Sequence, residues 1–185
     1  MYTLFIDTHS NKITIVLYKD NKIEIKKDVE TSHNHSVTTM PILIDALKEA
    51  GIEVEDLNEI LVVNGPGSFT GVRIGVTIAK TLAYTLNIPI KTLSSLLIKA
   101  VSFSHEKVRI VEREKNGVFL GTFDNDNHLV DNYTYVSNKE YETDGNDIED
   151  VEIDYEKILE FSKSLEAINP HAVKPLYVKL IEVQK

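Results

Sequence analysis

The segment from Asn64 to Gly75 holds the residues whose types and spacing are best suited to chemistry. A strand-like apolar run, Ile60 to Val63, leads into a glycine-rich turn, and a long apolar helical pattern follows the turn. The first N–H groups of a helix have no partner inside the helix and lie at the positive end of its dipole, so such a turn can hold an anion. The candidate anion site consists of Gly65, Pro66, Gly67, Ser68, Phe69, Thr70 and Gly71.

Neither standard phosphate-binding motif fits this turn. A Walker loop needs Gly-Lys followed by Ser or Thr, and no lysine follows Gly71. A dinucleotide fingerprint is Gly-x-Gly-x-x-Gly, whereas Gly65, Gly67 and Gly71 leave one residue too many. Spacing alone therefore leaves two interpretations open, an anion site and the close approach of another helix.

The helical pattern over about residues 70–87 favours close packing. Gly71, Gly75, Ala79 and Ala83 recur every four residues and form a groove of small side chains along one side. Large apolar residues cover most of the remaining surface, so the helix must be buried nearly all round. This is either an ordinary core helix or a core helix whose outer edge also contacts a partner protein. The outer polar stripe consists of Arg73, Thr77, Lys80, Thr81 and Tyr84.

The remaining reactive residue types do not form a recognisable site. His33 and His35 are two residues apart, and on a helix they would not share a face, so capping or surface roles are favoured over metal binding. Asp124, Asp126 and His128 alternate in a predicted hairpin turn, which a solvated loop explains. The chain has no His-Glu-x-x-His segment and no nucleophile-elbow pattern around a serine. We therefore expect no metal site, no cofactor and no protease activity.

Composition narrows the class of protein. The chain has 185 residues, 42% hydrophobic and 26% charged, as in ordinary globular proteins. A net charge of −9 makes it a poor nucleic-acid binder on its own, because phosphates would be repelled overall. It has no cysteine, hence no disulfide or thiolate chemistry. It begins directly with a strand pattern and has no membrane-length apolar run, so a cytoplasmic location is expected.

The elements that position the glycine turn form a regular series. Residues 1–7 and 13–17 alternate with period two, and the tight-turn dipeptide Asp20-Asn21 leads to a third strand at 23–25. A helix follows at about 36–50, capped by Ser36 or Thr38, with Pro41 near its start and Gly51 at its end. The series strand–strand–strand–helix–strand–helix is the layout of a ribonuclease-H-like half-domain.

Beyond the second helix, further strands and helices are predicted, followed by a region of less regular structure. Pro89 ends that helix, and residues 90–92 lead to a third helix capped by Ser94 or Ser95. Strands are predicted at 108–111, 118–123 and 129–136, with Asn116-Gly117 as a hairpin turn. Residues 138–160 are strongly acidic and predict a solvated, partly irregular surface. A short helix at 155–165 and a final strand at 175–180 complete the series. The predicted division lies between residues 1–103 and 104–185.

The residues Gly-Pro-Gly-Ser-Phe-Thr-Gly-Val-Arg-Ile-Gly at 65–75 resemble the signature of the TsaB family, the non-catalytic subunit in bacterial synthesis of threonylcarbamoyladenosine on tRNA. Further matches are the opening Leu4-Phe5-Ile6-Asp7-Thr8, His35-Ser36 before the first helix, Pro89 with the Ser94-Ser95-Leu96 helix start, and Pro175-Leu176-Tyr177-Val178-Lys179. The resemblance covers residues 1–103 well and 107–185 loosely.

The resemblance implies an α/β fold of the two-lobed actin/Hsp70/sugar-kinase-like (ribonuclease-H-like) type, here with a reduced second lobe. It implies a scaffold or activating role beside a TsaD-like catalytic subunit and a TsaE-like ATPase, with tRNA contacted only through the complex. Some members form homodimers through the same surface. Docking would use the helices at about 36–50 and 70–87. The implied contact residues are Val37, Met40, Ile44, Leu47, Arg73, Ile74, Gly75, Ala79, Lys80 and Tyr84.

The chain departs from the family pattern in its shorter second lobe and in residues 111–113, where Val-Glu-Arg replaces an Asp-Ala-Arg-like segment. An alternative function is a small nucleotide-binding ATPase that uses the turn from Gly65 to Gly71. Relatives of this superfold hold phosphates on Asp-Gly-Thr hairpins, and Asp7-Thr8-His9-Ser10 keeps the aspartate without the glycine. The backbone cannot easily approach a phosphate there, which favours Asp7 as a polar turn residue and a non-enzymatic role.

Overall fold

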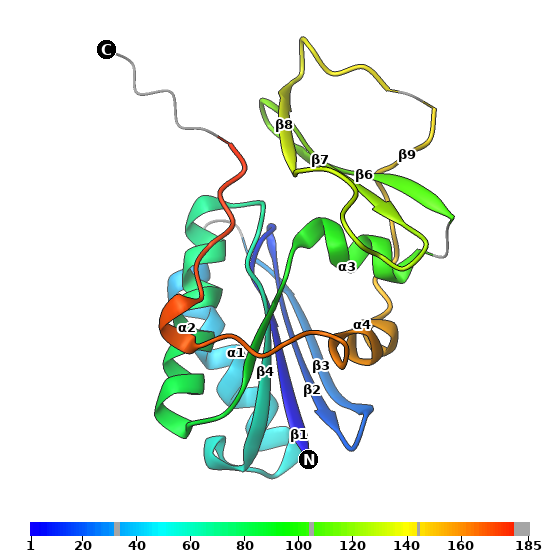
Figure 1. The fold of residues 1–185 in the computed structure, drawn as a ribbon. Coiled ribbons are helices and arrows are strands. Elements are labelled where there is room, and N and C mark those ends of the chain that lie inside the picture. Colours follow the sequence, from blue (N-terminus) through cyan, green and yellow to red (C-terminus); the bar gives the residue numbers. More distant parts are fainter. Residues whose placement is uncertain (32–33, 104–105, 144, 180–185) are drawn as a thin grey trace.

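A five-stranded sheet forms the centre of the first lobe in the computed structural model, which describes residues 1–31, 34–103, 106–143 and 145–179 (Figure 1). Its strands lie in the order β3-β2-β1-β4-β5. Three are joined as antiparallel neighbours, β1 (Tyr2–Asp7), β2 (Lys12–Lys19) and β3 (Lys22–Glu30), and two are added in parallel, β4 (Leu57–Val63) and β5 (Ile90–Leu93). The predicted meander and parallel additions are confirmed.

Successive side chains of each strand point to opposite sides of the sheet, so the sheet has two apolar faces. Leu4 and Ile6 of β1 point into one core, while Phe5 between them points into another. The turn between β2 and β3 is tight because Asp20 and Asn21 both adopt positive φ, of 48° and 67°, which Asp and Asn tolerate better than most residues. The predicted turn dipeptide is thus confirmed.

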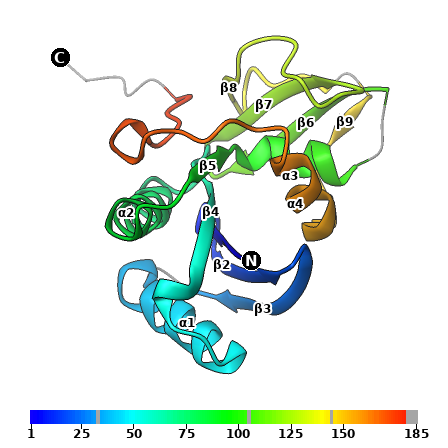
Figure 2. The same cartoon turned by 60° about the horizontal axis from the view of Figure 1, so that its bottom comes forward.

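Two helices cover each face of this sheet (Figure 2). On one side lie α1 (His35–Ala50) and α2 (Phe69–Leu86), and on the other α3 (Ser95–Ser102) and α4 (Tyr155–Ser162). The prediction that Ser36 or Thr38 caps α1 is wrong, because the helix begins at His35 after Asn34, and both residues lie in its first turn. Gly51 does end α1 in the left-handed conformation, with φ of 69°. Ser94 caps α3 as predicted.

A smaller four-stranded sheet forms the second lobe, in the order β8-β7-β6-β9. The hairpin of β6 (Lys107–Glu114) and β7 (Gly117–Asp124) turns at Lys115-Asn116, one residue before the predicted Asn116-Gly117, because Gly117 already pairs with Glu114 in the sheet. The predicted strand at 129–136 is shorter, since β8 covers only Thr134–Ser137. The acidic region also contributes a strand that was not predicted, β9 (Asp147–Ile148), which Arg109 holds through Asp147. Helix α3 packs against this sheet as well, so it lies between the lobes.

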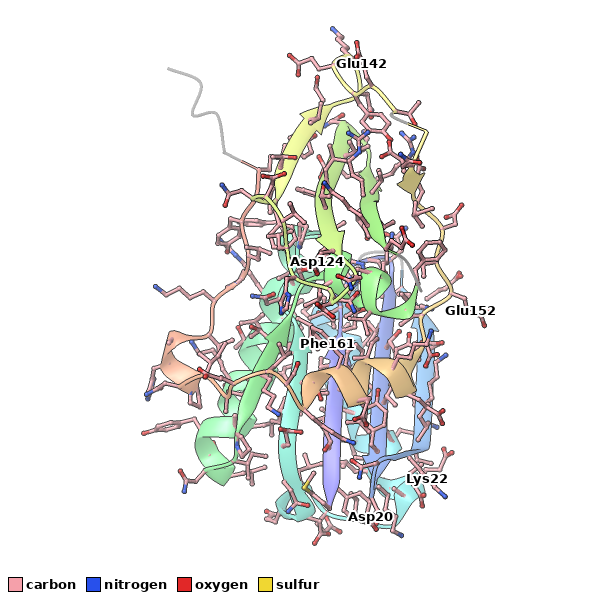
Figure 3. All side chains as sticks on the ribbon, turned by 45° about the vertical axis from the view of Figure 1, so that its right-hand side comes forward. Asp20, Lys22, Asp124, Glu142, Glu152 and Phe161 are labelled. Atoms are coloured by element: carbon pink, nitrogen blue, oxygen red, sulfur yellow. The ribbon has the colours of Figure 1, made fainter. Side chains whose placement is uncertain are left out.

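The chain returns to the first lobe after β9. Helix α4 buries Tyr155, Ile158 and Leu159 against the first sheet, so the predicted region 104–185 also supplies part of the first lobe in space. Two short 3₁₀ turns, Val54–Asp56 and Pro170–Ala172, lie before β4 and after α4. Figure 3 shows Asp20 and Lys22 at one end of the molecule and Glu142 at the other.

The predicted final strand at 175–180 is wrong over the described residues up to Lys179, which are irregular. The amide of Leu176 donates to the carbonyl of Asn64, 2.7 Å away, in the loop after β4. Within the described ranges, no helix has both the length and the apolar character needed to cross a bilayer.

Candidate functional site

The glycine turn connects the end of β4 to the start of α2. Gly65 and Gly67 have φ of 107° and 148°, conformations that side chains with a Cβ rarely adopt. Ser68 caps the helix, because its hydroxyl accepts a hydrogen bond from the Gly71 amide at 3.2 Å. Its carbonyl accepts the amide of Val72 at 2.9 Å. The sequence therefore builds the sharp strand-to-helix turn that was expected.

The small residues of the motif pack on the turn between β1 and β2. A Cβ on Gly67 would overlap the His9 carbonyl, and one on Gly71 would overlap the Thr8 carbonyl. Two hydrogen bonds fix this contact: the Ser68 amide donates to the His9 carbonyl at 2.7 Å, and the Thr8 hydroxyl donates to the Gly71 carbonyl at 2.7 Å. The glycines are thus approached by the turn between β1 and β2. Neither interpretation from the sequence, an anion site or another helix, named this turn.

A chain of buried charges crosses from the first lobe to the second beside this turn. The Nδ1 atom of His9 lies 2.6 Å from the Asp7 carboxylate, and its Nε2 atom lies 3.3 Å from the Glu112 carboxylate of β6. The other oxygen of Glu112 lies 2.8 Å from the ammonium of Lys99 on α3. The side chains of all four residues are at most 16% exposed.

These contacts shift the pKa values of His9 and Glu112 in opposite directions. Burial alone would lower the pKa of His9, but the Asp7 and Glu112 carboxylates outweigh it and raise the pKa from 6.5 to about 10. Burial alone would raise the pKa of Glu112. Its contacts with the positive charges of His9 and Lys99 outweigh burial and lower that pKa from 4.5 to about 2. At neutral pH the pair is therefore an imidazolium and a carboxylate that join the two lobes.

A cavity of about 950 Å³ lies between the lobes above the glycine turn. Its walls come from the turn, from strand β6 and from the C-terminal segment. The charged residues among the lining are His9, Arg73, Glu112, Arg113, Glu114, Lys115 and Lys179. His9 and Glu112 neutralise each other, and Lys179 pairs with Glu114.

The residues implied to contact a partner fall into two groups. Val37, Met40 and Ile44 of α1 are 69%, 38% and 43% exposed and form an apolar surface. Arg73 and Tyr84 of α2 are exposed, and Ile74 and Lys80 are half-buried. The others are buried in the protein's own core and cannot contact a partner in this fold, which corrects the prediction for Leu47, Gly75 and Ala79.

The reason for this correction is that the small-residue groove faces inward. A Cβ on Gly75 would overlap the hydroxyl of Thr8, and Ala79 lies in the core with Leu43 and Ile60. The spacing of small residues thus indicates close packing of α2 on the sheet of its own lobe. A separate groove of about 400 Å³ does open to the surface between α1 and α2. Its lining residues are Ser36, Met40, Phe69, Thr70, Arg73, Ile74, Thr77 and Ile78.

The outer stripe of α2 contacts the C-terminal segment. The Nε atom of Arg73 donates to the hydroxyl of Tyr177 at 2.8 Å, and the ammonium of Lys80 donates to the carbonyl of Val173 at 3.1 Å. The ring of Tyr84 lies 4.7 Å from the ring of His171, centroid to centroid. Sequence patterns could not show this contact, because the segment has no regular structure of its own.

The histidines have structural roles where the structure describes them. His35 is buried and its Nε2 lies 2.8 Å from the Ser10 carbonyl, while His33 lies outside the described residues. Asp124 accepts the amides of Asp126 and His128, as in an ordinary turn. The contact between His9 and Glu112 was missed; its only sequence signal is a charged residue directly after the predicted strand 108–111.

Solved structures define the fold class of the chain. A Pseudomonas aeruginosa protein, described as uncharacterized with similarity to the peptidase YeaZ, superposes with a TM-score of 0.80 at 18% identity and covers 96% of this chain and 99% of that one. An activator of 2-hydroxyisocaproyl-CoA dehydratase from Clostridium difficile, with bound ADPNP, superposes with a TM-score of 0.50 at 18% identity over 75% of this chain and 46% of that one. The chain therefore has the two-lobed actin/Hsp70/sugar-kinase-like fold.

Sequence comparison narrows this class. The Bacillus subtilis (strain 168) tRNA threonylcarbamoyladenosine biosynthesis protein TsaB is 37% identical over 134 residues, which are 71% of this chain and 58% of that protein. The Escherichia coli (strain K12) TsaB is 33% identical over 100 residues, 54% of this chain and 43% of that one. A family model described as "TsaD: tRNA N6-adenosine threonylcarbamoyltransferase" matches residues 27–114. The chain is a relative of the TsaB proteins and spans somewhat over half of the length of the B. subtilis relative.

Proposed function

We propose that this chain acts in the synthesis of threonylcarbamoyladenosine on tRNA as a non-catalytic subunit that docks on a TsaD-like catalytic protein. The similarity to TsaB proteins supports the pathway, and the exposed apolar surface of α1 supports docking. A TsaE-like ATPase would join the same assembly in the cytoplasm. The net charge of −9 favours tRNA contact through the complex over contact by this chain alone.

The observation that carries the proposal is the grouping of exposed large apolar side chains on one face. Val37, Met40 and Ile44 follow one another along α1, and Phe69 begins α2 at 49% exposure. Two of these side chains, Met40 and Phe69, line the open groove between the two helices. Contiguous apolar surface of this kind costs free energy in water and is typical of a protein–protein interface. A second copy of this chain, in a homodimer, is the competing occupant of the same face.

The test is to replace Ile44 with lysine and measure binding to the TsaD-like protein of the same genome by isothermal titration. Burying an unpaired ammonium in the interface should weaken binding by roughly 2 kcal/mol or more, about 30-fold. Val130→Lys is the matched control, because Val130 is 46% exposed but lies in the second lobe. Both variants should melt close to wild type. Wild-type affinity in Ile44→Lys would reject the proposed face.

The alternative, nucleotide binding at the glycine turn, has less support from the contacts of the turn. Thr8 and His9 lie directly against Gly67 and Gly71, and the amide of Ser68 is already bonded to His9. Titration of the isolated protein with Mg-ATP separates the two functions. Micromolar binding that Asp7→Asn abolishes would favour the ATPase over the docking subunit.

A further inference from the structure

We propose that Arg73 is a carboxylate-binding anchor for the docking partner, and that Tyr177 of the C-terminal segment is its positioning residue. The proposal rests on the proposed function and extends its surface beyond the two helices. The occupant is a partner segment that presents a carboxylate flanked by apolar side chains. Figure 1 shows the C-terminal segment passing along α2 before the end of the described chain.

Arg73 is held in place by two aromatic rings and one hydrogen bond. Its guanidinium carbon lies 3.6 Å from the centroid of the Phe69 ring and 5.6 Å from that of Tyr177. The rings themselves are 5.8 Å apart. Its Nε atom donates to the Tyr177 hydroxyl at 2.8 Å. Ring contacts and this bond restrict a side chain that would otherwise lose much rotamer entropy on binding, so the cation is pre-organised.

Arg73 differs from the other two arginines of the chain in what it binds. Arg109 pairs with Asp147, and Arg113 pairs with Glu149. Over residues 1–31, 34–103, 106–143 and 145–179, Arg73 forms no ion pair with a carboxylate, although its side chain is exposed. Because its Nε atom is already used, the two terminal nitrogens remain as a parallel pair of donors. Such a pair matches the two oxygens of a carboxylate.

The position of Arg73 links this anchor to the proposed docking face. Arg73 and Phe69 line the groove between α1 and α2 together with Met40 and Ile74, and Arg73 is the single charged residue among the groove's described lining. Phe69, Arg73 and Tyr177 also line the cavity between the lobes. Tyr177 is 56% exposed. A partner on the apolar face would thus meet one oriented cation with aromatic flanks, a combination that is common where interfaces concentrate binding energy.

A second copy of this chain fits this position less well than a different protein. In a two-fold symmetric dimer the same surface lies on both sides of the interface. Two exposed Arg73 cations on one shared face would then need carboxylates from the same small region. The groove lining supplies none in the described residues. A distinct partner with an acidic residue therefore satisfies the charge better.

The experiment compares Arg73→Gln, Arg73→Lys and Tyr177→Phe for binding to the TsaD-like protein of the same genome, by titration at two salt concentrations. Arg73→Gln should weaken binding by about tenfold or more and reduce its salt dependence. Arg73→Lys should fail to restore affinity, since an ammonium cannot form the paired contact. Tyr177→Phe removes only the hydroxyl and should weaken binding by roughly threefold. The matched control is Lys22→Gln, at the far end of the first lobe.

The possible outcomes separate this inference from the proposed function. If Ile44→Lys abolishes binding while Arg73→Gln binds like wild type, the anchor is wrong and the docking face stands. If Ile44→Lys has no effect, the face itself is wrong. Full affinity in Arg73→Lys would overturn the paired contact. A homodimer that Arg73→Gln dissociates, with unchanged binding to the TsaD-like protein, would overturn the choice of occupant.

Discussion

Replacing His9 with glutamine tests the buried charge chain between the lobes. The pKa of His9 is raised from 6.5 to about 10, so its protonated form is stabilised in the folded protein. A raised folded-state pKa contributes stability that is complete below pH 6.5 and is lost as the pH rises through 10. The side chain is only 11% exposed, so solvent screens the contact little.

The size of the effect follows from the same values. A pKa that moves from 6.5 to about 10 corresponds to roughly 4 kcal/mol of stability at pH 7, and less than about 1 kcal/mol remains at pH 10. His9→Gln has no such proton to lose. The difference in unfolding free energy between the wild-type protein and the variant should therefore shrink by about 3 kcal/mol between pH 7 and pH 10.

Urea denaturation of both proteins at several pH values measures this difference. Lysine and tyrosine titrations are common to the two proteins and cancel in it. The carbonyl of His9, which accepts the Ser68 amide, is backbone and is retained in glutamine. Parallel stability profiles from pH 7 to pH 10 would refute the reasoning, because His9 would then be neutral or would lack its carboxylate partners.

Two further predictions concern single contacts, each measured as an unfolding free energy in urea. Gly71→Ala should destabilise by roughly 3 kcal/mol, because its Cβ would overlap the backbone of Thr8. Gly145→Ala is the control, because an added Cβ there would meet no atom within 4 Å; it should cost only about 1 kcal/mol, since φ is 79°. A Gly71→Ala variant that is as stable as wild type would contradict the packing. Asp147→Asn should cost about 2 kcal/mol at pH 7, because the hydrogen bond from Arg109 lowers the pKa of Asp147 from 3.8 to about 2. That stability is present above pH 3.8 and is lost as the pH falls through 2, so an unchanged acid profile in the variant would count against it.

Local patterns were sufficient to predict most elements of the first lobe. Strands β1 to β3 follow period-two alternation and the Asp20-Asn21 turn, and helix α2 follows the glycine turn within one residue of the predicted start. The fold class was predicted from the order of these elements and from the motif at 65–75. Such features depend on neighbours in sequence, which is why the sequence alone reveals them.

The features that the sequence did not reveal depend on residues that are distant in the chain. Nothing near His9 indicates that Glu112 lies against it, and nothing in the acidic region indicates that Asp147 pairs with Arg109. The spacing of Gly71 and Gly75 correctly indicated a close approach but could not say that Thr8 makes it. Exposure also had to come from the fold, since Ile44 and Leu47 are both among the implied contact residues and only Ile44 is exposed.

The return of α4 to the first sheet has a consequence for how the protein is made. Phe5, near the start of the chain, packs against Tyr155, with ring centroids 5.7 Å apart. On the ribosome, α3 alone can therefore cover this face of the first sheet until residues 155–159 have been translated. The second lobe behaves as an insertion within the first, and a nascent chain that stops before α4 exposes apolar surface to chaperones and proteases.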